Sequence, residues 1–487
     1  MELLTEKTLD EFKGLMSNVI ENLLSSIKEY INQKKYLSNY DDYPMAINFK
    51  GSYGWPDIQS TNLLTGLGKD RYEFVDYLSA ITLHQSEDKI LIDNVKGFKE
   101  LLDFTNKCSS IISRIWYSGD SSSDKSRIAL FFLIGNIIDR YINIYDSTIY
   151  TIDNFDFIYY QVTNIYFLDQ LEFDICVPIL MVEFESDIIK ISENISIEKM
   201  TDEFIRSKYN IGKYDSHFEK LVLNCATHML VLNGYHLDIE NFRSTENFDN
   251  KYSYPVQVID IILASIRIIS RFNIGYAQFV CRPTNNWINS NCKGDLIGVT
   301  GAKAKEYPEM FLAHSWLKPH NVITSIMESQ IGELANKLLE DNNNVLNLAL
   351  NRLNRSLLRS NEEDTILDAI IGLELLLSDN DKGELTYKIS SRMAALSTLY
   401  DQFPYSPVMV QKSVSQIYRY RSDIVHSRKP RPSTKLIKIN ENIEVAPIEI
   451  AIDYLRYAID ILARNPQYLD SKKIDELMME RLQRDTL

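Results

Sequence analysis

The chain has 487 residues, of which 45% are hydrophobic and 24% charged, and its formal net charge is −15 at pH 7. This length predicts two or three domains, and the ordinary composition excludes a long disordered chain. The acidic balance argues against broad, non-specific coating of nucleic acid or of an anionic membrane surface.

The cysteines and the apolar runs indicate a cytoplasmic protein that does not enter a membrane. Five scattered cysteines without a CxxC pair do not form a disulfide framework, and they favour a reducing compartment. The start, MELLTEKTLDEFKGLM, carries acids where a signal peptide needs a basic region. The longest apolar runs, residues 128–138 and 259–270, are too short to span a bilayer and are expected to form buried helices.

Residues 1–150 are predicted to form an N-terminal helical region. An apolar stripe from Leu9 to Leu23 recurs every three or four residues, which indicates a helix within residues 1–40. The segment GSYGWPDIQST has the Gly, Pro, Ser and Asp content of a loop. Further helices are expected at residues 70–85, 94–117 and 125–145.

Residues 151–325 are predicted to form an α+β region with several strands. The segments FDFIYYQVTNIYF, FDICVPILMVEF and DIIKISENISIEKM are rich in Ile, Val, Tyr and Phe and are separated by polar breaks, which favours strands. Helical patterning resumes at Thr201 and at residues 254–272, and a strand followed by a loop is expected at 276–287. Residues 288–325 carry much of the Gly and Pro and are predicted to be the inter-domain connection.

Residues 326–487 are predicted to form a helical bundle whose antiparallel neighbours are joined by short loops. The fold class is therefore mainly α, with a C-terminal bundle preceded by a larger α+β region. The expected helices cover residues 327–340, 343–360, 362–378, 384–401, 407–427, 447–464 and 470–484.

The only strongly basic stretch lies inside this predicted bundle. Between Gln411 and Asn440 there are eight Lys and Arg residues, against Asp423 as the one acid. Such a local stripe on an acidic chain indicates a focused site for a polyanion. A solvated helix end followed by a loop explains the same charges equally well.

One arginine of this stretch occupies an apolar position. Val410, Val414, Ile417, Arg421 and Ile424 share one helix face by their spacing. A guanidinium without partners is prohibitively costly to bury, so Arg421 must find a carboxylate or face a cleft.

Residues on other helices offer this arginine one candidate partner and one competitor for that partner. Glu374 interrupts the apolar run ILDAIIGLELLL and is the candidate partner of Arg421. Arg392, beside Met393 and Leu396, competes for the same glutamate. On this structural alternative, a buried Glu–Arg pair simply holds the bundle together.

His426 follows Arg421 by five residues. On a straight helix the two side chains point roughly 140° apart, so they converge only where the helix ends or distorts. Pro430 and Pro432 supply a reason for an ending, because the residue before a proline resists the α conformation. Arg421 is therefore expected in the last helical turns and His426 at the helix end.

The segment Arg421-Ser-Asp-Ile-Val-His426 resembles the R-x4-H signature of the HEPN superfamily, whose members are helical bundles and often metal-independent ribonucleases. The wider frame, DAIIGLELLLSDNDKGELTYKISSRMAAL followed by QIYRYRSDIVHSR, is similar to the ApeA-like HEPN group. The good resemblance covers residues 343–465. A weaker one, to regions that precede such domains, includes FDICVPILMVEFES, and residues 1–150 resemble nothing named.

The chemistry that this resemblance implies needs no metal and no cofactor, because RNA carries its own nucleophile in the 2′-hydroxyl. His426 would act as base or acid near neutral pH, and Arg421 would hold the scissile phosphate. Ser422 and Asp423 are the polar residues of the signature, and Asp423 would orient the imidazole or the guanidinium. The resemblance also implies a homodimer or higher homo-oligomer, in which two copies of the motif share one cleft.

The rest of the basic stripe is expected to contact RNA on either side of the scissile phosphate. Tyr418 or Tyr420 would stack on an unpaired base. The flanking phosphates would be bound by Arg419, Arg428, Lys429 and Arg431.

Other motifs are weaker. Cys225, His228 and His236 have some character of zinc ligands, but zinc needs three or four ligands and the surrounding sequence is typical of a core. TGAKAKEY lacks the GK[ST] of a P-loop.

Three hypotheses follow. The leading one is a cytoplasmic endoribonuclease of the ApeA-like HEPN kind that cleaves RNA, including tRNA, in phage defence or as a growth-arresting toxin. Its first two thirds would sense a trigger or restrain the nuclease, with a trigger or antitoxin protein as a further partner. The second is a non-catalytic HEPN module for dimerisation and for binding RNA or nucleotides. The third makes Arg421–Glu374 a core ion pair and leaves His426 idle.

Overall fold

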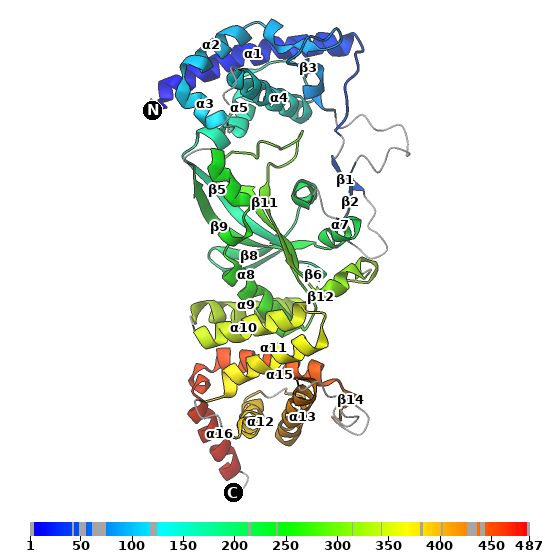
Figure 1. Cartoon of the computed structure of the whole chain (residues 1–487), viewed down its shortest axis with the longest axis vertical. Coiled ribbons are helices and arrows are strands. Elements are labelled where there is room, and N and C mark those ends of the chain that lie inside the picture. Colours follow the sequence, from blue (N-terminus) through cyan, green and yellow to red (C-terminus); the bar gives the residue numbers. More distant parts are fainter. Residues whose placement is uncertain are drawn as a thin grey trace.

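The computed structural model describes residues 4–484, except for 41–42, 48–54, 61–74, 117–123, 213–215, 240–241, 314, 342, 380–382, 401–402, 426–435 and 439–443. N-terminal helices, a central sheet and a C-terminal helical bundle follow one another along the long axis of the molecule (Figure 1). The predicted mainly helical fold class is confirmed. The predicted domain boundaries stay predictions.

The N-terminal helices pack around one apolar core. Helix α1 begins after Thr5, whose hydroxyl accepts the backbone N–H of Thr8, and it buries one stripe that includes Phe12, Met16 and Leu23. The helices of this region are α1 (Glu6–Asn32), α2 (Phe98–Lys107), α3 (Ser109–Ile115), α4 (Lys125–Tyr145) and α5 (Ile152–Phe167). Two short strands, β3 (Ile81–Thr82) and β4 (Ile90–Leu91), accompany these helices. The strands β1 (Pro44–Ile47) and β2 (Asp57–Ser60) pair with each other beside the central region instead (Figure 1).

Three predictions for the first half of the chain were wrong. Residues 155–167 were expected to form a strand but belong to α5, which begins after Thr151, whose hydroxyl accepts the backbone N–H of Asn154. The aromatic and β-branched composition favours a strand, whereas the buried positions recur at helical spacing. The described part of the helix expected at 70–85 forms a short 3-10 turn at Tyr77–Ala80, followed by strand β3. The segment 51–61, expected to be a loop, contains strand β2 in its described part.

Helix α4 contains the apolar run that was judged too short to span a bilayer. The complete helix is 21 residues long, and by length and composition alone it is able to cross a membrane. In the folded chain, 61% of its apolar window is buried inside the protein. Asp139 and Arg140 of α4 are also buried and hydrogen-bond to the loop around Gly294, so α4 packs as a core helix.

A six-stranded antiparallel sheet forms the centre of the molecule (Figure 1), with the order β11-β10-β5-β9-β8-β7. One face is covered by α8 (Val256–Ser270) and α9 (Ser325–Glu340), and the other by α6 (Asp202–Lys208) and α7 (His217–Asn224). The strands are β5 (Gln170–Pro178), β7 (Ile188–Ser192), β8 (Ile195–Lys199), β9 (His228–Asp238), β10 (Tyr276–Pro283) and β11 (Thr300–Glu306). A separate parallel pair joins β6 (Val182–Phe184) to β12 (Asn321–Ile323).

The stretch 288–325, expected to be a connection between domains, contributes an edge strand to this sheet. In β11 the side chains alternate, so that Ala302 and Ala304 face the core while Lys303 and Lys305 are exposed. The Gly and Pro of this stretch indicated a connection, and the Ala and Lys of β11 gave no opposing signal because these residues are poor strand formers.

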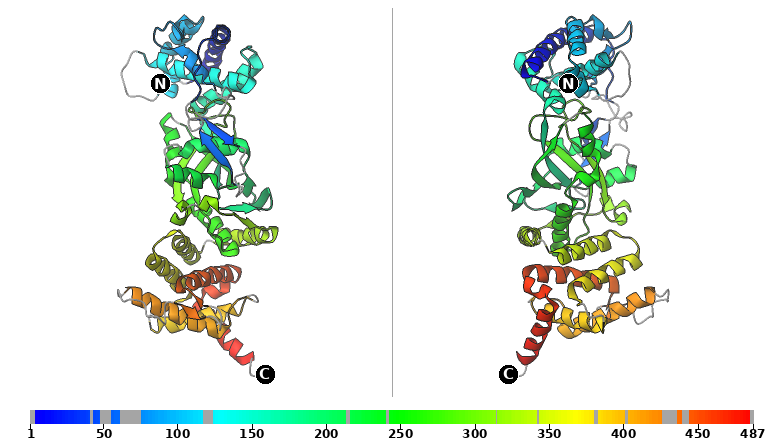
Figure 2. Two further views of the ribbon diagram at one scale, coloured as in Figure 1. Left: turned by 90° about the vertical axis from the view of Figure 1, so that its right-hand side faces the viewer. Right: turned by 60° about the vertical axis from the view of Figure 1, so that its left-hand side comes forward.

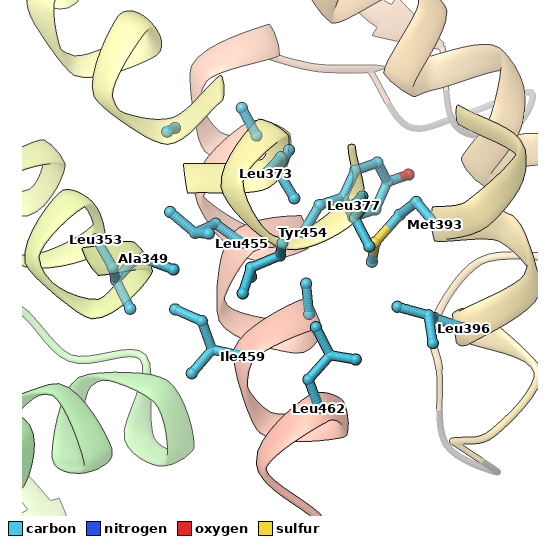
Figure 3. Packing of buried hydrophobic residues seen from close by; sticks show 14 of the residues in the cluster. Ala349, Leu353, Leu373, Leu377, Met393, Leu396, Tyr454, Leu455, Ile459 and Leu462 are labelled. Carbon is cyan, nitrogen blue, oxygen red and sulfur yellow. The ribbon is translucent and has the colours of Figure 1, made fainter. Parts of the chain in front are cut away.

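The C-terminal bundle has every helix that the periodicity predicted. Helix α15 (Pro447–Arg464) runs through its centre, where Tyr454, Leu455, Ile459 and Leu462 pack against the surrounding helices (Figure 3). Those helices are α10 (Asn344–Leu358), α11 (Glu362–Leu377), α12 (Leu385–Ser397) and α13 (Pro407–Val425). The last helix, α16 (Ser471–Arg484), extends beyond the bundle at the C-terminal end (Figure 2).

Helix α8 belongs to two cores at once. Ile259, Ile262 and Ile266 pack into the sheet core, while Ile261 and Ile268 pack into the bundle core. Because successive faces of one helix serve different cores, the bundle is fixed to the sheet through apolar contact on both sides.

A buried arginine reinforces this junction. The guanidinium of Arg267 donates to Asn354 Oδ1 of α10 at 2.6 Å and to the carbonyl of Ile274 at 2.9 Å. Burial lowers the pKa of Arg267 to about 10, and the nearby Asp260 carboxylate opposes that shift. The arginine of α8 therefore connects the bundle to the loop that leads into β10 by hydrogen bonds as well as by packing.

We expect Asn354→Leu to lower the free energy of unfolding by about 3 kcal/mol, because it leaves a buried guanidinium without its side-chain partner. The double variant Arg267→Met with Asn354→Leu should be less destabilised than Asn354→Leu alone, since no charge is then stranded. Chemical denaturation followed by circular dichroism measures both. Equal losses in the single and double variants would contradict this role of Arg267.

A second buried cation, Lys208 of α6, predicts a pH dependence. Its side chain is 2% exposed, and Nζ donates to the carbonyl of Leu223 at 2.9 Å. Burial lowers the pKa of Lys208 from 10.5 to about 8. Between these two values the unfolded chain binds a proton that the folded chain does not, so the folded state gains stability as the pH rises from 8 toward 10.5.

We therefore expect the stability of the wild-type protein, relative to Lys208→Met, to increase by about 2 kcal/mol between pH 7 and pH 10. Denaturation of both proteins across this range measures the difference and cancels the titration of other groups. A difference that stays constant with pH would show that Lys208 is not the group responsible.

Candidate functional site

Helix α13 positions the predicted site. Its inner face buries Val410, Val414 and Ile417 in the bundle core, and Arg421 takes the next position on this face. The described part of the helix ends at Val425. Four predicted site residues lie outside the described residues, namely His426, Arg428, Lys429 and Arg431. The convergence of Arg421 with His426 therefore stays a prediction.

Arg421 lies beside the carboxylate that was proposed as its partner, but the contact is long. Its Nη1 is 4.0 Å from Glu374 Oε1, and its side chain is 35% exposed. The same Glu374 oxygen accepts the hydroxyl of Tyr418 at 3.1 Å. Within the described part of the chain, Arg421 Nε has no hydrogen-bond partner. An ion pair with this geometry contributes little to stability, so Glu374 leaves most of the guanidinium available.

The other described residues of the motif differ in exposure. Ser422 and Arg419 are exposed, whereas Asp423 is only 2% exposed. The side chain of Asp423 thus lies inside the bundle. If it orients the guanidinium or the imidazole, as predicted, it does so from the buried side of α13.

The two tyrosines expected to stack on a base are both buried. Tyr418 and Tyr420 are each 8% exposed and belong to the bundle core, and Tyr418 also donates its hydroxyl to Glu374. Burial raises the pKa of each phenol. Both rings are therefore largely enclosed by the bundle, although Tyr418 also contributes to the lining of the groove beside Arg421. Stacking of either ring on RNA stays a prediction.

Arg392 is a structural ion-pair residue, but it does not compete for Glu374. Its guanidinium donates to both carboxylate oxygens of Asp475 at 2.8 Å, to Asp379 at 2.7 Å and to the carbonyl of Leu377 at 2.8 Å. It is 4% exposed, and these hydrogen bonds raise its pKa. Arg392 therefore fastens α16 to the bundle, a long-range pairing that sequence spacing did not reveal.

A groove of about 790 Å³ separates α12 from α13 beside Arg421. Three of the described residues that line this groove are cations, namely Lys412, Arg419 and Arg421. None of the described lining residues is acidic. The wall also contains residues of α12 and α13 that sequence reasoning did not single out, and for those on α13 the spacing along its polar face was the available signal. These are Thr386, Tyr387, Ser390, Gln411, Ser415 and Gln416.

The histidines and cysteine with zinc-like spacing do not meet. His228 and His236 lie eight residues apart along β9, which separates them by about 26 Å in an extended strand. Cys225 and His228 are buried, while His236 is exposed. Within the described part of the chain, no group of three or more potential metal ligands is found.

Comparisons with family models, with curated proteins and with solved structures give no match to this chain. The resemblance between the segment 421–426 and the HEPN signature therefore rests on the sequence alone. What the structure adds is the geometry around Arg421: a long ion pair, an unpaired Nε and a basic groove.

The two arginines should respond differently to substitution. Arg392→Met removes a buried guanidinium that binds two carboxylates, so we expect it to lower the free energy of unfolding by about 2 kcal/mol or more and to expose α16 to proteases. Arg421→Met breaks one long, partly exposed pair and should cost less than about 1 kcal/mol. Chemical denaturation and limited proteolysis test both. A large loss for Arg421→Met would assign that arginine to the core.

Proposed function

We propose that this protein is a metal-independent endoribonuclease of the HEPN kind and that Arg421 and His426 carry the cleavage. One observation supports this most directly: Arg421 stands at an apolar seam position, yet its guanidinium is 35% exposed and lines a basic groove. An arginine that served only to bind Glu374 would be expected to form a short, buried pair, as Arg392 does with Asp475.

In this mechanism, Arg421 binds the non-bridging oxygens of the scissile phosphate through its planar set of donors. His426, whose imidazole is able to bind or release a proton near neutral pH, removes the proton of the 2′-hydroxyl or protonates the departing 5′-oxygen. Attack of the 2′-oxygen on phosphorus breaks the bond to the 5′-oxygen. The products are a 2′,3′-cyclic phosphate and a 5′-hydroxyl, and no metal ion takes part.

One chain supplies one histidine, whereas the reaction needs both a base and an acid. We propose that two copies pair so that two motifs share a cleft, with the groove between α12 and α13 opening toward it. Glu374 holds Arg421 loosely through its carboxylate, while the hydroxyl of Tyr418 fixes that carboxylate in place. This arrangement leaves the guanidinium able to turn toward a phosphate.

The wider setting follows from family analogy. We propose a cytoplasmic protein that acts in phage defence or as a growth-arresting toxin, in which the first two thirds of the chain respond to a trigger or bind an antitoxin. The acidity of the chain favours restraint of RNA binding outside the basic groove.

Purified protein should cleave tRNA or mRNA in EDTA, and Arg421→Ala and His426→Ala should each reduce the rate at least about 100-fold. Mass spectrometry of the fragments should show 2′,3′-cyclic phosphate ends. Two matched controls, Arg355→Ala on the exposed face of α10 and His84→Ala, should keep full activity.

Cleavage that survives in both Arg421→Ala and His426→Ala would locate the reaction elsewhere in the chain. Binding of RNA by every variant, with no cleavage even when cell extract supplies a trigger, would favour a non-catalytic binding module instead. The mass in solution, by light scattering, should correspond to a dimer or larger.

A further inference from the structure

The groove between α12 and α13 continues well beyond Arg421. Its α13 wall extends from Gln411 to Ser422, which corresponds to about 16 Å along the helix axis. Tyr387 and Ser390 of α12 form part of the facing wall. The two helices lie side by side in the lower part of Figure 1. The groove is thus long enough to hold more of a ligand than one phosphate.

Two polar atoms buried at this groove have no hydrogen-bond partner among the residues that the structure describes. Arg421 Nε is a donor, and Gln416 Oε1 is an acceptor. Buried polar atoms are nearly always paired, so an unpaired donor and an unpaired acceptor in one groove point to a ligand that carries both complements. A nucleotide has them, since its phosphate oxygens accept hydrogen bonds and its base donates them.

An exposed aromatic ring lies in the same groove. Tyr387 is 59% exposed, in contrast to the buried rings of Tyr418 and Tyr420. Exposed tyrosines in basic grooves stack on unpaired bases, and each such contact contributes substantially to the binding of single-stranded nucleic acid. Tyr387 can therefore stack on a base, which is the role that the sequence analysis assigned to Tyr418 or Tyr420.

The charges favour RNA over a second copy of the chain as the occupant. Lys412, Arg419 and Arg421 line the groove, and none of its described lining residues is acidic. In a two-fold symmetric dimer that closed over this groove, the same three cations would face one another and repel. A polyanion neutralises them instead.

We infer that Tyr387 and Gln416 form a base-reading subsite of the proposed nuclease, and this inference rests on the proposed function. The nucleotide next to the phosphate on Arg421 lies along the groove, its base stacks on Tyr387, and its exocyclic amino group donates to Gln416 Oε1. Adenine, cytosine and guanine carry such an amino group, whereas uracil presents carbonyl oxygens beside its single ring N–H. The subsite therefore favours these bases over uracil.

Binding of oligonucleotides that cannot be cleaved tests this directly. Fluorescein-labelled, fully 2′-O-methylated oligo(A), oligo(C) and oligo(U) lack the nucleophile, so fluorescence anisotropy reports affinity alone. Wild-type protein should bind oligo(A) or oligo(C) at least about fivefold more tightly than oligo(U). Gln416→Leu should abolish this preference, and Tyr387→Ala should weaken binding of all three by about fivefold or more.

A second variant at Gln416 guards against a simple folding defect. Gln416→Glu keeps the length of the side chain but adds a negative charge to the groove, so all three affinities should fall. Matched controls are Tyr252→Ala, at a tyrosine that is 83% exposed, and Gln330→Leu on the exposed surface of α9. Both should bind like the wild type.

The possible outcomes separate this inference from the proposed reaction. If Arg421→Ala and His426→Ala abolish cleavage while Tyr387→Ala and Gln416→Leu bind like the wild type, the base-reading subsite is refuted and the proposed nuclease activity is supported. If the groove variants change binding but no cleavage occurs, the reaction fails and the groove remains an RNA-binding surface. If Tyr387→Ala converts a dimer into a monomer, the groove belongs to a second copy and the subsite is again overturned.

Discussion

The double burial of α8 is the constraint on which the rest of the structure depends. One face of this helix completes the core beneath the sheet, and another completes the core of the bundle. Apolar packing is tight and tolerates little void, so the two cores cannot shift independently without opening cavities along α8. Arg267 adds a directional restraint, because its guanidinium needs acceptors from both sides of the junction.

Periodicity predicted the bundle well because its helices are long and each has one apolar face. The same reasoning failed where composition and spacing disagreed, as in α5, whose aromatic and β-branched residues are typical of a strand but recur at helical intervals. It also failed for β11, where small and charged residues alternate in a strand that pairs along one edge only. Local propensity is a weak guide at such positions because tertiary packing decides them.

For the candidate site, the sequence predicted the seam position of Arg421 and its proximity to Glu374. It did not predict the pairing of Arg392 with Asp475, since that contact joins residues 83 positions apart. The burial of Tyr418 and the exposure of Tyr387 were also missed. Both depend on how α12 and α13 pack against each other, and a single helix pattern holds no information about its neighbour.

The placement of the groove on an otherwise acidic chain restricts how a polyanion reaches it. At an ionic strength of 0.1 M, charges are screened beyond about 10 Å, so a strand arriving from elsewhere meets mainly the surplus of carboxylates. Only within that distance of α13 do Lys412, Arg419 and Arg421 attract it. For the RNA that we propose as the ligand, productive encounters would be confined to the side of the molecule that carries the groove, and added salt would weaken repulsion and attraction together rather than simply reduce the rate of capture.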